Sequence, residues 1–303
     1  MKIKLFKYLF VTLVGCSATQ QSLGQTYKSV SSSVNVDLGL SNMLGDLGGT
    51  NFVGNDGVFD LDLRATRPAI GLGYNFNIGS VSAGTNILYT HLVGNDAFTI
   101  QEFQKTRNLS VRTNLLEANF MLEWRPFSRS YGFNRFYLTG GVGGVYYNPK
   151  AEFEDEWIEL RPLGTEGQNF KDGYAPYKEI DCVIPFGAGY KFRLARSTSL
   201  VLELTARKTF TDYLDDVSTV YADPFGIEVN SNDYRARALA DRSLNGREVG
   251  SERGNPEVND TYILLGFKLE QILGGGSGDG CYYNKAPRKK RSTRINQRGM
   301  FKK

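Results

Sequence analysis

Residues 116–124 read LEANFMLEW, and apolar and polar side chains alternate along this stretch. In an extended strand the even-numbered side chains, from Leu116 to Trp124, share one face, because successive side chains point to opposite sides. Glu117, Asn119 and Glu123 then lie on the other face. A helix would scatter the two kinds of residue around its axis, so the stretch predicts a β-strand with one apolar face.

The same two-residue period recurs along the chain, always with turn-forming residues between the segments. The sequence therefore predicts an all-β fold of eight strands. Besides the stretch just described, the segments are 34–41, 70–76, 82–90, 136–146, 180–192, 200–207 and 262–269.

The lengths of the connections distinguish between two all-β architectures. Residues 77–80, 127–134 and 193–198 are short links, and they alternate with the long links 42–67, 92–108, 148–178 and 211–259. A soluble sandwich also alternates apolar and polar residues. Short periplasmic turns, long extracellular loops and aromatic residues at the strand ends are typical of outer-membrane barrels. We therefore predict an eight-stranded antiparallel transmembrane β-barrel over residues 25–272, in the cell outer membrane, with a side-chain-filled interior and no pore.

The N-terminus predicts export. Lys2, Lys4 and Lys7 precede a short apolar stretch, and small residues precede Gln25, so residues 1–24 have the pattern of a signal peptide. A second interpretation stays open, because LVGC at 13–16 is also a lipoprotein processing site with Cys16 as the lipidated residue.

The C-terminus combines a Gly-rich linker with a strongly basic tail, over residues 273–303. From Cys281 onward the tail carries a charge of +9, which leaves −5 for the rest of a chain whose total is +4. With an even number of strands this tail lies in the periplasm, where it meets no nucleic acid. Two interpretations stay open: a solvated tail attracted to outer-membrane lipids, and an arm that docks on an acidic periplasmic protein. The predicted partner-binding residues are Cys281, Tyr282, Tyr283, Lys285, Arg288, Lys289, Lys290, Arg291, Arg294 and Arg298.

Two cysteines remain after removal of the N-terminal segment. Cys182 falls on the face assigned to lipid, whereas Cys281 follows the linker. A bond between them would draw a charged tail into the bilayer, which is costly. Cys281 is therefore expected to be a free thiol or half of an intermolecular disulfide.

Several motifs resemble the PorG family, the outer-membrane barrel of the Bacteroidetes type IX secretion system, and the resemblance covers nearly the whole mature chain. The motifs are NVDLGLSNMLGDLGG at 35–49, RNLSVRTNLLEANFMLEW at 107–124, YYNPKA at 146–151, PLGTEGQ at 162–168, TFTDYLDDVSTVYAD at 209–223 and DRS at 241–243. The resemblance implies a non-enzymatic barrel that anchors or positions the periplasmic ring of PorK and PorN. The basic tail would then contact the ring, with PorK as a candidate disulfide partner of Cys281.

Two loop motifs have a further interpretation. Pro162, Leu163, Gly164, Thr165, Glu166 and Gly167 form the first, and Asp212, Tyr213, Asp215 and Asp216 form the second. The aspartates suggest calcium, but their spacing is not that of an EF-hand loop. We expect no metal or cofactor, and instead turn-capping or pairing with the arginines of the same loop. These are Arg235, Arg237, Arg242 and Arg247.

Two other functions are compatible with a small barrel. One is a lipid A-modifying enzyme, for which His91, Ser110 and Glu117 are the available catalytic types, although they form no motif. The other is a structural or ligand-binding barrel. The inward Glu117, Glu123, Glu203 and Arg207 are expected to pair with one another inside the barrel.

Overall fold

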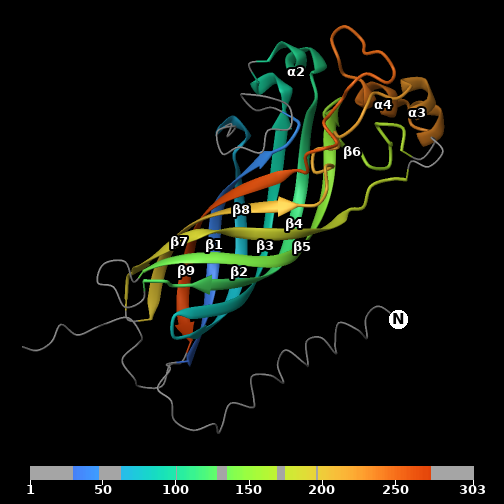
Figure 1. The fold of residues 1–303 in the computed structure, drawn as a ribbon. Coiled ribbons are helices and arrows are strands. Elements are labelled where there is room, and N and C mark those ends of the chain that lie inside the picture. Colours follow the sequence, from blue (N-terminus) through green and yellow to red (C-terminus); the bar gives the residue numbers. More distant parts are fainter. Residues whose placement is uncertain are drawn as a thin grey trace, which may run out of the picture.

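The computed structural model describes residues 30–47, 63–99, 101–127, 135–168, 175–195 and 197–273. Eight strands form an antiparallel barrel, and short helices gather beyond one end of it (Figure 1). The barrel strands are β1 (Val30–Leu44), β2 (Arg67–Ile78), β3 (Val81–Asn95), β4 (Ser110–Trp124), β5 (Phe136–Phe153), β7 (Ile180–Arg193), β8 (Thr198–Thr209) and β9 (Thr261–Leu273).

Neighbouring strands pair in the order β4-β3-β2-β1-β9-β8-β7-β5, and a further pairing of β4 with β5 closes the barrel. The first and last strands are direct partners, with Gly39 opposite Gly266. The eight barrel strands therefore leave no open edge along the wall, which is the arrangement a membrane demands.

The exterior of the barrel is apolar and the interior is polar. Val36, Leu72 and Leu122 are among the many outward side chains that are at least 45% exposed. On the same strands Asp37 and Glu123 are buried inside. The predicted assignment of the two faces is thus confirmed, and the eight-stranded transmembrane barrel fold with it.

The predicted strands are all present, but most are longer at the end that carries the long loops. The segment predicted at 34–41 extends over Val30–Leu44, and β5 continues seven residues beyond the predicted 146. One strand was missed: β6 (Glu156–Glu159) pairs with the upper part of β5 and lies outside the barrel wall.

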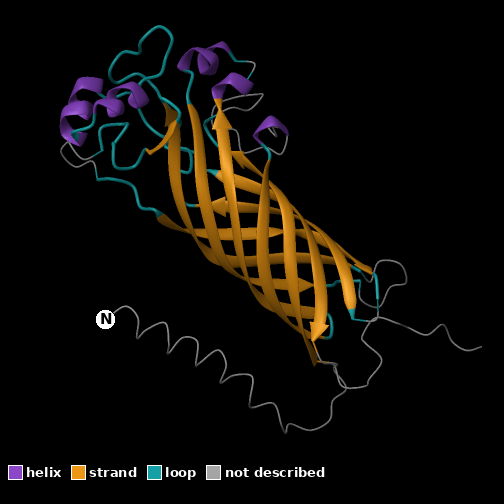
Figure 2. Cartoon of the chain, turned by 180° about the vertical axis from the view of Figure 1, so that it is seen from behind, coloured by secondary structure: helices purple, strands orange, loops and turns teal. Residues whose placement is uncertain are grey.

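The described parts of the long connections are folded into a cap, which Figure 2 shows over one end of the barrel. It contains the 3₁₀ helices Leu63–Ala65 and Asp96–Phe98 and the helices α2 (Glu102–Arg107), α3 (Pro224–Ser231) and α4 (Tyr234–Ala240). The other end carries the short turns, and we call it the periplasmic end because outer-membrane barrels place their short turns there. No helix in the described ranges is long and apolar enough to cross a membrane.

Two groups of predictions lie outside the described residues. The first is the N-terminal segment 1–24 with Cys16. The second is the tail from residue 274, with Cys281 and every other residue predicted to bind a partner. Cys182 is described, and it faces outward from β7, as predicted; its thiol is free.

Candidate functional site

The periplasmic half of the lumen is filled by pairs of opposite charge. Lys191 Nζ lies 2.9 Å from the Glu123 carboxylate and 3.1 Å from that of Glu270. Lys268 Nζ lies 2.8 Å from Glu203, whose other oxygen accepts a hydrogen bond from the Tyr137 hydroxyl. Glu123 and Glu270 come from strands on opposite sides of the barrel, β4 and β9, so the pairs of Lys191 bridge the lumen instead of lining a channel.

The middle of the lumen is closed by one buried ion pair. Arg207 Nε donates to Glu117 at 2.9 Å, and the Tyr262 hydroxyl donates to the same carboxylate at 2.6 Å. The expected pairing of inward charges is therefore confirmed for Glu117 with Arg207. The predicted pairing is wrong for Glu123 and Glu203. Glu123 pairs with Lys191 of β7 and Glu203 with Lys268 of β9, because these lysines lie at the same level of the barrel.

The extracellular mouth is plugged by an apolar cluster. Leu214, from the loop after β8, is fully buried among side chains of six strands. The Thr113 hydroxyl donates to the Leu214 carbonyl and so holds this loop inside the mouth. Above it, the rings of Tyr177 and Tyr213 stack with their centroids 4.6 Å apart. The other members of the cluster are Met43, Leu92, Leu115, Val145, Tyr147, Val183 and Tyr262.

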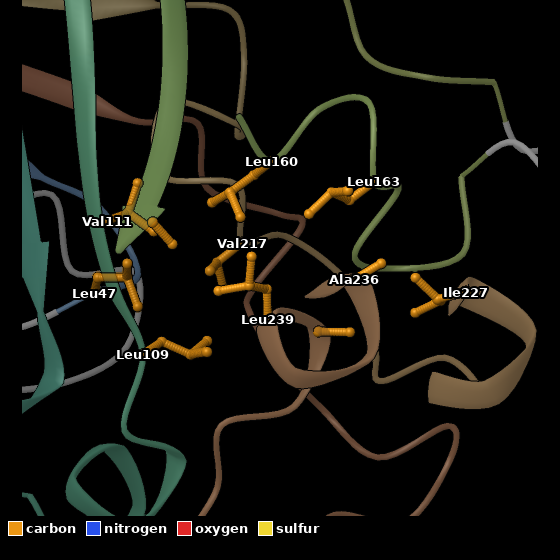
Figure 3. Packing of buried hydrophobic residues seen from close by; sticks show 11 residues of the cluster. Leu47, Leu109, Val111, Leu160, Leu163, Val217, Ile227, Ala236 and Leu239 are labelled. Carbon is orange, nitrogen blue, oxygen red and sulfur yellow. The ribbon is translucent and has the colours of Figure 1, made fainter. Parts of the chain in front are cut away.

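Beyond the mouth, the cap has a hydrophobic core of its own (Figure 3). Each of the four long connections contributes to it, for example through Leu47, Leu109, Leu163 and Val217. Helices α3 and α4 supply Ile227, Ala236, Leu239 and Ala240. Both helices begin where an aspartate caps them: Asp223 accepts from the backbone of Phe225 and Gly226, and Asp233 from that of Arg235.

The first loop motif forms the polar centre of the cap. Gly164 and Gly167 have positive φ angles of 64° and 84°, a backbone conformation that glycine adopts readily in turns. The turn places the Glu166 carboxylate, which accepts hydrogen bonds from the backbone of Ser218 and Thr219 and from Arg253 at 2.9 Å. Glu166 thus ties the loop after β6 to the loop after β8.

A second arginine connects other parts of the cap. Arg107 binds Asp96 through two hydrogen bonds of 2.8 and 2.7 Å. It also donates to the carbonyl oxygens of Asp46 and Arg253. Both arginines are almost completely buried, so each is a fixed cross-link between loops that are far apart in the sequence.

Four further aspartates lie buried between the mouth and the cap core: Asp46, Asp212, Asp215 and Asp260. We call them the aspartate cluster. Burial raises the pKa of Asp46 to about 7 and that of Asp212 to about 9. It also raises the pKa values of Asp215 and Asp260 well above the ordinary value, and the neighbouring aspartates reinforce the effect on both. Among the described residues no three acidic, histidine or cysteine side chains converge as a metal site would require.

The predicted roles of the second loop motif are partly confirmed. Asp215 does cap a turn, because it accepts a hydrogen bond from the backbone of Val217. Asp216 accepts from Tyr177 and Thr165 and lies 3.8 Å from Arg253. The pairing with arginines of the same loop was predicted for the wrong residues. Those four arginines bind elsewhere or stack on rings, with Arg235 on Asp233, Arg237 over Phe225, Arg242 on Ser110 and Arg247 on Thr106.

The three residues considered for catalysis lie apart. Glu117 is buried in the lumen on Arg207, whereas His91 is half-buried near the upper end of β3. Ser110 pairs with Asn95, four residues further along β3 than His91, and it accepts a hydrogen bond from Arg242. The fold therefore does not assemble a nucleophile, base and acid from these residues.

Comparison with known proteins gives similarity of overall shape alone. The sequence matches no protein-family model and no curated protein. Among solved structures, the chain is similar to Ail, the attachment invasion locus protein of Yersinia pestis, with 8% identity and a TM-score of 0.38. That alignment covers 81% of this chain and 99% of Ail. Neisserial surface protein A is similar at 7% identity and a TM-score of 0.36, over 81% of this chain and all of the other.

Proposed function

We propose that this chain is a non-enzymatic anchor in the outer membrane, which positions the periplasmic PorK/PorN ring of the type IX secretion machinery. The observation that carries the proposal is the closed lumen. Charge pairs fill its lower half, the pair of Arg207 and Glu117 crosses its middle, and Leu214 plugs its mouth. A barrel closed at three levels offers no path for a polypeptide, so its contribution is made through its ends.

The family resemblance supports the choice of partner, and charge supports the choice of surface. The tail carries +9 beyond a Gly-rich segment, and this positive charge would attract an acidic assembly below the membrane and speed their encounter. Tyr282 and Tyr283 would add apolar contacts, and Cys281 would lock the complex covalently in an oxidising compartment.

The test is a truncation after Leu273, the last residue of β9, expressed in cells that make the ring proteins. We expect the truncated barrel to insert and fold, and PorK and PorN to no longer co-purify with it. A full-length variant in which the tail lysines and arginines are changed to glutamine separates charge from chain length. If the ring co-purifies equally with the truncated barrel, the anchoring proposal is wrong.

The proposed intermolecular disulfide of Cys281 is tested separately. On a non-reducing gel, a band heavier than the monomer should disappear on reduction and in Cys281→Ser. Cys182→Ser is the matched control, since that thiol faces outward from the barrel wall. A monomer in every lane would remove the disulfide from the proposal while leaving docking through charge.

One observation favours a second function, binding at the cell surface. Helices α3 and α4 expose Phe225, Val229 and Tyr234, which are 59%, 82% and 64% accessible. Exposed apolar side chains on a folded cap are typical of contact surfaces. If the cap binds a partner at the cell surface, Val229→Ser combined with Tyr234→Ser should abolish that binding. Truncation of the tail should leave the binding unchanged.

A further inference from the structure

The outward side chains of β3, β4 and β5 change from apolar to polar at one level near the extracellular end. Tyr89, Leu116 and Tyr146, paired across the three strands, form the last apolar row and are 47%, 46% and 42% exposed. Along β4, eight residues separate Leu116 from Trp124 near the periplasmic end. This is about 27 Å of strand and, with the usual tilt, about 20 Å of height, close to the full apolar band. The next outward row therefore lies among the headgroups of the outer leaflet.

That next row carries polar side chains on β3 and β4. His91 pairs with Asn114, and Arg112 follows two positions further along β4, so all three share the outward face with Tyr89 and Leu116. Each of the three is half-buried. They therefore lie against the barrel wall instead of extending freely into solvent. We call His91, Arg112 and Asn114 the headgroup patch.

The guanidinium of Arg112 is held in place but its donors are unused. It lies 5.4 Å from the centroid of the Trp157 ring, on β6 beside the upper part of β5 (Figure 1). Such a contact orients the planar group and leaves its N–H donors available. The described part of the chain provides Arg112 with no hydrogen bond and no ion pair.

The neighbouring cation on the same face is already paired. Lys150 lies opposite Arg112 on β5, and its ammonium group lies 2.9 Å from the Glu159 carboxylate. Asn148 donates to the same carboxylate at 2.9 Å. Arg112 thus remains as the uncompensated charge of this face, and Arg67 lies near enough to His91 to add to the positive field.

Asn114 shows the opposite deficit. Its buried carboxamide oxygen accepts no hydrogen bond from any described residue. Buried acceptors in native proteins are nearly always paired, so this oxygen points to a donor from outside the chain. The headgroup patch therefore presents a cation with unused donors beside an acceptor that needs one. A ligand that carries both an anionic group and a hydroxyl or amide N–H complements it.

We propose that the headgroup patch binds a phosphate of lipid A, the acylated glucosamine lipid of the outer leaflet. The Arg112 fork would hold the phosphate through two parallel N–H donors, and Asn114 would accept from a hydroxyl or amide of the sugar. The acyl chains would lie over the row of Tyr89, Leu116 and Tyr146. This position at the edge of the apolar band favours a lipid over a free anion. The inference does not depend on the ring-anchoring function proposed above.

The experiment uses the full chain in detergent micelles. His91 is the one histidine of the sequence, so a single imidazole reports on the patch by NMR. Its resonances should shift when phosphorylated lipid A is added. They should shift far less with lipid A from which the phosphate has been removed, and far less with inorganic phosphate at the same concentration. The chain has two tryptophans, so in Trp124→Phe the emission of Trp157 measures the affinity.

Arg112→Gln tests the cation. It should insert and fold, because the side chain faces outward, and it should bind phosphorylated lipid A about 10-fold to 150-fold more weakly. Arg112→Lys should be intermediate, since it keeps the charge but loses the planar fork. Lys208→Gln is the matched control. Lys208 is an outward cation on β8, on the opposite side of the barrel, and it donates to the Asn259 carbonyl, so the affinity should be retained.

Three results would overturn the proposal. The first is equal binding of lipid A with and without its phosphate. The second is equal affinity of Arg112→Gln and Lys208→Gln, because the charge at this one place would then not matter. The third is a full shift of the His91 resonances with inorganic phosphate, because the patch would then be a site for a free anion and not for a lipid.

Discussion

Arg253→Met tests how far the cap depends on a single buried cation. The guanidinium lies 2.9 Å from Glu166 and 3.8 Å from Asp216, and all three side chains are at most 2% exposed. Methionine keeps an unbranched apolar stem but leaves both carboxylates without their cation. Breaking a buried ion pair in this way costs about 3–5 kcal/mol, which raises the opening equilibrium about 150-fold to 5,000-fold.

The loss of cap stability caused by Arg253→Met should depend on pH. Burial raises the pKa of Asp216 to about 6 even with Arg253 present. Its protonated form is therefore favoured in the folded cap, and stability is lost as the pH rises through about 6. The penalty of Arg253→Met should accordingly be largest at pH 8 and smaller at pH 5, where Asp216 carries a proton in both proteins.

Cap opening is measured by trypsin cleavage and by hydrogen exchange of the cap amides in micelles. Arg242→Met is the control, because Arg242 is half-buried and makes one hydrogen bond with Ser110, so its effect should stay within about 0.5 kcal/mol. Adding Glu166→Gln to Arg253→Met should restore part of the stability. The reasoning is refuted if Arg253→Met opens the cap no more than the control does, or if the double variant is additive.

Two further outcomes are expected. Gly189→Ala places a Cβ 2.4 Å from the buried Tyr137 hydroxyl, so the ring must move away from Glu203. The free energy of unfolding of the barrel, measured by urea denaturation, should fall by about 1–3 kcal/mol, and the urea midpoint should fall with it. Gly144→Ala, whose Cβ meets nothing nearer than 3.9 Å, should leave the midpoint unchanged, and equal effects of the two would contradict this packing. The cap should lose stability as the pH rises through about 7 and about 9, because burial raises the pKa values of Asp46 and Asp212 to these values. Proteolysis rates across this range should rise, with the step near pH 9 absent in Asp212→Asn.

The barrel could be predicted from the sequence because its signal is local. Alternation within a segment such as 116–124 reports directly which side chains face lipid, and the lengths of the links report the topology. The strand ends were less well predicted, since β4 and β5 continue above the apolar band, where the exterior pattern turns polar at Arg112 and Lys150.

The cap could not be predicted in the same way, because its contacts join residues far apart in the chain. Arg253 meets Glu166 across 87 positions, and Asp215 binds the backbone of Asp46 across 169. The sequence singled out Glu166, Asp212 and Asp215 as members of loop motifs. It offered no reason to select Arg107, Arg253 or Asp260, whose roles depend on which loops pack together. The unusual number of aspartates in residues 209–223 was the one visible signal.

Strand β5 has a mechanical consequence for the whole molecule. Its 18 residues span roughly 60 Å, whereas the apolar band of an outer-membrane barrel is about 25 Å tall. The strand pairs with β7 in the wall and with β6 above it, while β4 accompanies it from Leu138 to Lys150. A force pulling on the cap along the barrel axis therefore loads these hydrogen bonds in shear, many at once, and not one at a time as in unzipping. Because β5 belongs to both the cap and the wall, it connects the two directly, and such a force is carried along its paired length toward the periplasmic end of the barrel.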